Sequence, residues 1–565
     1  APRPMWKYRD WVINAFNKDM PFSQFTIEQI AGDLLPNPTV DQLIATGFHR
    51  NTPSNFEGGI DFEQYRNEAV ADRVATTGSV YLGLTVGCAR CHDHKYDPIA
   101  QKEFYQLFAY YNSTDEITKQ PERDDFYRPY IDLPTEKEKA DAKVYWEKAT
   151  ALSREVMARI DELQGQPAAE KDEELRKRIQ ALRTFMRPLG IPGSPEYHWP
   201  QPYITRALVM KELPKPRESF IQLGGDFLRP SDRVYPEVPA VLSRGKKIGG
   251  NRLDLAKWLV DPSNPVTARV TVNRIWQEYF GKGIVETQDD FGLIGARPTH
   301  QELLDWLATE FMSNGWKQKP IHKLIVMSAT YRQSSKHRED LDEVDPYNKL
   351  LARQSRFRLD AEIIRDAALV SSGLLSPAVG GEAVHPPIPE NAMNGTQIKR
   401  AWDTDTGDNR YRRGVYTFFF RSLPAPSLAL FDAPDGTSSC TRRVRSNSPL
   451  QSLTLLNDEA FLEFAGALAK RTLKEGGATD QDRMNYAWLL VLGRRPQPAE
   501  SARLMKYLAE QKQVFTEDSK SAEELLTRPG MTASPGAGKQ ELAQLAAWTA
   551  VGRVLFNLDD FMTRE

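Results

Sequence analysis

Two of the three cysteines in this chain stand three positions apart, and a histidine directly follows the second, in Cys88-Ala89-Arg90-Cys91-His92. The C-x-x-C-H pattern is the attachment sequence of c-type haem, in which both thiols form thioethers and the histidine binds the iron. Cysteines at this spacing share one side of a helical turn, so the next imidazole can reach under the porphyrin. The sequence therefore predicts one covalent haem c, held by Cys88, Cys91 and His92.

Other kinds of site use the same residues. Zinc binds thiolates and imidazoles, so the two cysteines with His92 and His94 are an alternative zinc site, although so compact a string lacks the usual distant pair of ligands. A redox-active dithiol also has the C-x-x-C spacing, but the surrounding sequence lacks a thioredoxin-like βαβ pattern. A vestigial motif with a structural role is the remaining alternative. Haem is the interpretation that the pattern favours.

A haem iron has a second axial position, for which the sequence offers His49. It stands in a polar, glycine-flanked loop, so we consider it a second iron ligand or a group of the distal pocket. Arg50 and Arg66 are candidates to pair with haem propionates, because a guanidinium matches a carboxylate bidentately. Nearby carboxylates either form ion pairs around the cofactor or supply a proton acceptor beside it. The weak catalytic candidates are Glu57, Asp61, Glu68 and Asp72.

The rest of the composition is that of a globular protein, with 40% hydrophobic and 27% charged residues. A chain of 565 residues exceeds the size of one core, which predicts two to four domains. The net charge of −2 gives no signal for binding nucleic acid. No apolar run approaches the ~18 residues that a membrane span needs, so we expect no membrane-spanning segment.

Periodicity places the motif between two helices. Apolar residues at helical spacing predict a helix over residues 66–86, running into the cysteines. Asp97-Pro98 predicts the start of a following helix, with proline at its first position. The aromatic stripe of that helix, which includes Phe104 and Tyr111, packs either in the core or against the porphyrin.

We expect a mainly α-helical, multidomain fold with short β segments around residues 200–245. Residues 1–120 form the haem-bearing domain, and residues 121–200 form a charged helical hairpin. Residues 201–245 are a proline-rich linker with short strands, and residues 246–565 form a large helical domain.

The C-terminal region offers a third cysteine and a basic cluster. Cys440 is expected to be free and buried. Arg442, Arg443 and Arg445 either bind a sulfate, a carboxylate or an acidic sugar, or tie their loop to Asp432 and Asp435. The sequence contains no G-x-S-x-G elbow and no H-E-x-x-H motif.

Longer strings resemble a known pair of domains. The strings GFHRN from Gly47 and CARCHDHKYDP from Cys88 resemble the planctomycete cytochrome-like domain of unknown function. The strings LDLAKWLVDPSNP from Leu253 and NSPLQSLTLLND from Asn447 resemble the planctomycete-type C-terminal domain that usually follows it. Family members carry a longer N-terminal part of the first domain, so we expect this chain to be a fragment, a processed form or one product of a divided gene.

The resemblance implies a haem signature and export, without an established reaction. We expect a periplasmic or otherwise exported protein whose signal segment lies outside this chain. Its expected function is electron transfer or oxidation in carbohydrate catabolism, with another cytochrome as redox partner. An enzyme of this kind would be a haem-dependent oxidoreductase acting on a carbohydrate or a sulfated glycan. The alternative is a non-redox protein that binds a glycan or a partner, with structural zinc or a vestigial site at the motif.

Overall fold

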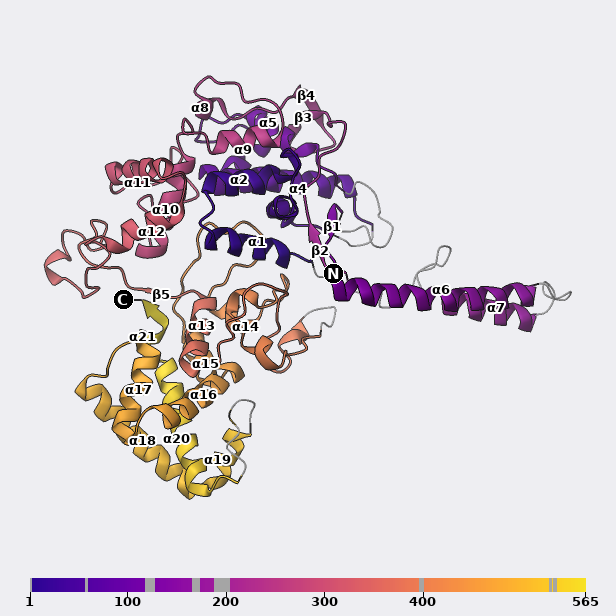
Figure 1. The fold of residues 1–565 in the computed structure, drawn as a ribbon. Helices are drawn as coiled ribbons and strands as arrows, with labels where there is room; N and C mark the ends of the chain where they lie inside the picture. The colour runs from indigo at the N-terminus through magenta and orange to yellow at the C-terminus, as the bar shows by residue number, and fades with distance from the viewer. Residues whose placement is uncertain are drawn as a thin grey trace.

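The computed structural model describes residues 3–55, 59–116, 128–164, 173–186, 204–395, 401–527, 531 and 536–564. The fold is mainly α-helical, with short strands in two-stranded ribbons, as the sequence predicts. The N-terminal half of the chain forms an upper lobe, the C-terminal part forms a lower lobe, and a helical hairpin extends away from the body (Figure 1). In the described part of the chain, no helix has both the length and the apolarity that a membrane crossing requires.

The helices of the upper lobe are α1 (Trp6–Asn17), α2 (Phe22–Ala31), α3 (Val40–Ala45), α4 (Phe62–Thr77), α5 (Gln101–Asn112), α8 (Ala240–Ser243) and α9 (Arg252–Leu259). Most of them pack around a core that extends along the chain from Ile30 to Leu259, and α1 and α3 share a second, smaller core with Phe25. The ribbon of the lobe pairs β3 (Ser219–Gln222) with β4 (Pro230–Val234) in antiparallel fashion. The aromatic stripe of α5 is buried in the larger core, so the lobe depends on packing between segments far apart in the sequence.

The two helices around the cysteines are shorter than the sequence predicts. Helix α4 begins at the Asp61 cap, and its last regular turn gives way to a π-turn at Gly78. Gly83 then has a left-handed φ of 59°, which reverses the chain ahead of the cysteines. Helix α5 begins at Gln101 instead of Pro98, because Ala100 is still extended and its N–H donates to the Glu103 carboxylate as the cap of the helix.

The charged segment forms two helices, α6 (Glu136–Gln164) and α7 (Glu173–Met186), which lie side by side away from the body (Figure 1). They share a small apolar core that includes Ile160 and Ile179. At the base of the hairpin, β1 (Tyr130–Asp132) pairs with β2 (Arg206–Leu208) in antiparallel register. Strands β2, β3 and β4 are the short β segments expected around residues 200–245.

A third helical group joins the upper lobe to the lower one. It contains α10 (Thr267–Phe280), α11 (Gln301–Ser313) and α12 (Gln318–Met327) around its own core. The lower lobe contains α13 (Ala361–Ser372), α14 (Pro426–Leu430), α15 (Pro449–Asn457), α16 (Glu459–Glu475), α17 (Asp480–Leu492), α18 (Pro498–Glu517), α19 (Ser519–Leu526), α20 (Lys539–Phe556) and α21 (Asp559–Met562). Its ribbon pairs β5 (Phe357–Arg358) with β6 (Thr563–Arg564), which brings the C-terminal end of the chain back to the start of the lobe.

Candidate functional site

The C-x-x-C-H motif lies at the surface of the upper lobe, in residues 86–97, which we call the attachment loop. A 3₁₀ turn over Val86–Arg90 places Cys88 and Cys91 on the loop. Both thiols are free and exposed, and the His92 side chain is exposed as well. The three side chains are therefore accessible to a group that binds from solvent.

A hydrogen bond to the backbone fixes the His92 imidazole. Its Nδ1 lies 2.6 Å from the carbonyl oxygen of Asp93. A carbonyl oxygen only accepts hydrogen bonds, so Nδ1 carries the proton and the neutral ring keeps a lone pair on Nε2. Metal-binding histidines are commonly oriented in this way, by a hydrogen bond from the nitrogen that does not bind the metal.

Beside the attachment loop lies a groove of about 490 Å³, and we call this groove the α4 groove. This volume falls within the roughly 300–1,000 Å³ that is typical of ligand sites. The loop contributes Gly87 and Arg90, the neighbours of the two cysteines. The rest of the lining comes from Pro53, Ser54, Asn55, Tyr65, Glu68, Ala71, Asp72, Ala75 and Phe104.

The structure brings two of the four candidate carboxylates to the α4 groove. Both oxygens of Glu68 accept from the Arg90 guanidinium, at 2.5 and 2.6 Å. Burial raises the pKa of the Asp72 carboxyl, and the positive charges of Arg73 and Arg421 only partly offset this. Asp61 caps α4 and is exposed, while Glu57 lies outside the described residues.

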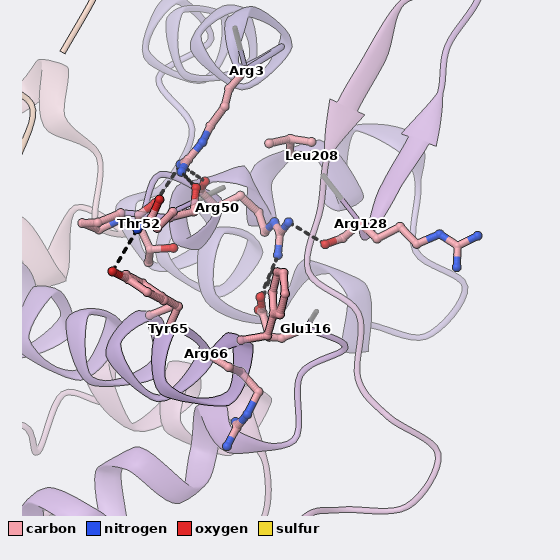
Figure 2. Close-up of a pocket in the computed structure, with 13 residues that line it drawn as sticks. Arg3, Arg50, Thr52, Tyr65, Arg66, Glu116, Arg128 and Leu208 are labelled. Atoms are coloured by element: carbon pink, nitrogen blue, oxygen red, sulfur yellow. Dashed lines mark hydrogen bonds and ion pairs between the residues drawn. The ribbon is translucent and has the colours of Figure 1, made fainter. Parts of the chain in front are cut away.

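A smaller pocket of about 80 Å³ adjoins the α4 groove and shares the stretch from Pro53 to Asn55 with it (Figure 2). Arg50 lines this pocket and contacts Glu116 at 3.3 Å and the Arg128 carbonyl at 2.8 Å. Burial lowers the pKa of the Arg50 guanidinium, although Glu116 opposes the shift. The Arg66 guanidinium extends away from the pocket in Figure 2 and binds Glu63 and Asn112.

His49 occupies the core of the upper lobe, where its side chain is only 1% exposed. The imidazole packs edge-on against Tyr111, with 4.8 Å between ring centroids. Burial holds the pKa of His49 well below its usual value, and the positive charges of Arg73 and Arg252 lower it further. Because His49 lines neither the α4 groove nor the smaller pocket, the structure does not bring it to the attachment loop.

His94 has a position that the sequence did not reveal. Its ring is buried, with Nε2 at 3.0 Å from the Thr85 hydroxyl oxygen. Its Nδ1 accepts hydrogen bonds from the backbone N–H groups of Asp97, at 2.8 Å, and Tyr96, at 3.3 Å. With both nitrogens engaged, His94 is not presented as a zinc ligand. Among the described residues, no group of three or more His, Cys, Asp or Glu side chains converges on a common point suited to a metal ion.

Residues 281–300, between α10 and α11, form a segment that we call the α10–α11 loop. It contacts the last residue of the attachment loop and the turn at Gly83 that precedes this loop. The Leu293 N–H donates to Asp97 Oδ1 at 2.7 Å, and the Phe291 N–H donates to the Gly83 carbonyl at 2.7 Å. Arg274 of α10 also donates to the carbonyl oxygens of Ser79 and Val80. The exposed motif is thus held by polar contacts on both sides.

Cys440 is exposed, so the expectation of a buried thiol was wrong. Its loop lies on the surface, and the Sγ is 3.2 Å from the Arg442 carbonyl oxygen. Partial burial still raises the pKa of the Cys440 thiol, against the nearby charge of Arg443. The thiol is therefore less ionised than an ordinary cysteine, which argues against a reactive nucleophile.

The basic cluster beside Cys440 pairs with other acids than those expected. Arg443 binds Glu362 at 2.5 Å, and Arg445 lies 3.5 Å from Asp360. Asp432 pairs with Arg358 of β5 instead. These contacts tie the loop to the first turn of α13 and its cap, and they account for the charges of Arg443 and Arg445 without a ligand.

Two family models match the chain. PSCyt2, a protein of unknown function (DUF1549), matches residues 1–116, and PSD1, a protein of unknown function (DUF1553), matches residues 251–508. The two matched ranges contain the strings that resemble the planctomycete-type pair of domains. No curated protein and no solved structure matches it. The attachment loop lies in the first matched domain, and the α10–α11 loop lies in the second.

Proposed function

We propose that this protein attaches one c-type haem through Cys88 and Cys91, with His92 as an axial ligand, and uses it in electron transfer or oxidation. The observation that supports this most directly is the Nδ1 contact of His92 with Asp93. It leaves Nε2 as the coordinating nitrogen, beside two free and exposed thiols. A bound haem would supply a one-electron redox centre at this surface.

The residues around the motif fit such a group. The α4 groove begins at the neighbours of both cysteines and offers apolar contacts from Ala71, Ala75 and Phe104. Arg90 of the loop contributes a guanidinium to the groove, and Glu68 holds it in place. Asp72, with its raised pKa, is the groove residue best suited to accept or donate a proton in an oxidation.

The proposal extends to location and partners. Thioether attachment of haem is completed outside the cytoplasm, so we propose an exported protein. A redox partner protein is required for turnover, and the family resemblance favours a carbohydrate-type substrate. His49 is not part of this proposal, because its imidazole lies in the core.

The test is to produce the chain with a haem-attachment system and to record its optical spectrum before and after reduction. Wild-type protein should show a c-type α-band and retain its haem through acid–acetone extraction. The Cys88→Ala/Cys91→Ala double variant should lose all covalent haem. Cys440→Ala is the matched control, because it removes an exposed thiol elsewhere and should retain full haem.

A second pair of measurements separates the alternatives. His92→Ala should keep the thioethers but change the ligand-field spectrum, because it removes only the axial nitrogen. Wild-type protein that contains zinc by elemental analysis, without a c-type band, would refute the haem proposal and favour the non-redox alternative.

A further inference from the structure

Two buried side chains just beyond the C-x-x-C-H motif connect it to the rest of the protein. We infer that His94 and Asp97 are positioning residues that fasten the attachment loop, His94 to Thr85 and Asp97 to the α10–α11 loop of the second matched domain. The inference rests on the proposed function, since it explains how the haem-binding residues are presented.

His94 closes the attachment loop at its base. Its Nδ1 accepts two backbone hydrogen bonds, so in the neutral ring the proton lies on Nε2, which donates to the Thr85 hydroxyl oxygen at 3.0 Å. Thr85 precedes the 3₁₀ turn and His94 follows His92, so the bond between them brackets both cysteines and the axial histidine. The His94 backbone N–H also donates to the Ile99 carbonyl at 2.8 Å.

Asp97 joins the loop to the second matched domain. Its Oδ1 accepts the Leu293 N–H at 2.7 Å, and the side chain is only 6% exposed. The neighbouring Gly292 lies so close that an added Cβ would come within 2.4 Å of both Asp97 carboxylate oxygens. A side chain at position 292 would therefore require the buried Asp97 carboxylate to shift, which makes the α10–α11 loop a close-fitting partner of the attachment loop.

The fastening matters because His92 is oriented by its own loop. The acceptor for its Nδ1 is the backbone of Asp93, so the direction of Nε2 follows the path of the loop. An exposed loop without buried contacts would sample many conformations and would pay the entropy of ordering when the haem binds. The contacts of His94 and Asp97 order the loop when the protein folds, so this entropy is not lost when the haem binds.

Thr85→Val tests the first contact, because it removes the acceptor hydroxyl while it keeps the shape of the side chain. Thr85→Ser is the matched control, because it retains the hydroxyl. In haem-free protein, amides in residues 86–97 should exchange hydrogen about fivefold faster in Thr85→Val, the effect of losing one hydrogen bond. Thr85→Ser should exchange like wild type, and amides of α16 should be unchanged in both variants.

The second measurement uses the haem-loaded full chain. Thr85→Val should shift the midpoint potential and the ligand-field spectrum, because the His92 ring loses its fixed direction. Thr85→Ser should reproduce the wild-type potential and spectrum. A purely structural role for Thr85 would lower the melting temperature of the variant and leave both of these unchanged, which would overturn the inference.

Asp97 is tested in the same way with a second pair of variants. Asp97→Leu removes the acceptor for the Leu293 N–H, whereas Asp97→Asn keeps an oxygen at that position. Faster loop exchange in Asp97→Leu, rescued in Asp97→Asn, supports the inference, and equal exchange in both variants refutes it. If wild-type protein takes up no haem, the proposed function fails, and the exchange measurements on haem-free protein still decide whether the loop is fastened.

Discussion

The two histidines predicted to bind one iron lie in regions of the upper lobe that are built in opposite ways. His49 belongs to a buried polar core, together with Arg73, Glu116 and Arg252, in which every side chain is largely enclosed. His92 stands in the exposed attachment loop, where a backbone contact engages Nδ1 and leaves Nε2 open. The comparison teaches that the same residue type is packed among other side chains in one region and keeps one ring nitrogen accessible from solvent in the other.

The two regions also use charge differently. In the buried polar core, Arg252 is fully enclosed and binds Asp33 and Glu212, each at 2.7 Å. Burial alone would lower the pKa of Arg252, but the two carboxylates outweigh it and raise the pKa. In the attachment loop, Arg90 pairs with Glu68 while 26% of the arginine side chain is exposed. We therefore expect the buried network to stabilise the fold, and the ion pair of Arg90 with Glu68 to contribute little to stability.

The largest expected effect separates these two networks. Arg252→Met should lower the free energy of unfolding by about 3–5 kcal/mol, because it leaves two carboxylates without their buried cation. Arg90→Met should cost about 0–1 kcal/mol, since its ion pair is partly exposed and screened by solvent. Urea unfolding of both variants measures the difference, and equal losses would contradict the contrast between the regions.

A smaller effect is expected where the attachment loop meets the second matched domain. Gly292→Ala should destabilise the protein by about 1–3 kcal/mol, because its Cβ would overlap the Asp97 carboxylate. Gly395→Ala is the control, since an added Cβ there meets no atom of the described residues within 4 Å. Thermal unfolding checks the pair, and a Gly292→Ala protein as stable as the control would show that the contact is loose.

A third effect concerns the pH dependence of stability. His49 has a lowered pKa in the folded state, so below about pH 6.5 the unfolded chain binds more protons than the folded one. This part of the stability is present above that pH and is lost on acidification, at up to about 1.4 kcal/mol per pH unit, until the folded pKa is reached. His49→Leu should lack this loss. Denaturant unfolding from pH 4.5 to pH 7.5 tests it, and parallel curves for the two proteins would contradict the prediction.

Much of the fold could be predicted from the sequence. Apolar residues at helical spacing identified the helices, because such spacing forms one apolar stripe. The residues at which the helices begin and end could be predicted less exactly. The helix expected to run to the cysteines ends early because the chain must turn at Gly83, where the Phe291 N–H binds the carbonyl. That contact joins segments far apart in the sequence, so no local pattern reports it.

The candidate site was predictable to the same extent. The spacing of Cys88, Cys91 and His92 identified a possible attachment motif, and the charged stretch on α4 contained Glu68 and Asp72, which line the groove. The burial of His49 depends on Tyr111 of another helix, and the role of His94 depends on backbone N–H groups that only the folded loop aligns. Both are consequences of tertiary structure.

The turn between β3 and β4 has a chemical consequence for the two thiols. A Cβ added at Gly225 would lie 2.8 Å from the Cys91 sulfur, so the ribbon backbone shields one side of that atom. An electrophile can approach Cys91 only from the remaining directions. The two sulfurs therefore differ in their accessibility to reagents. A molecule with two different reactive ends that bonds to both sulfurs would be accepted in one orientation in preference to the orientation with its ends exchanged.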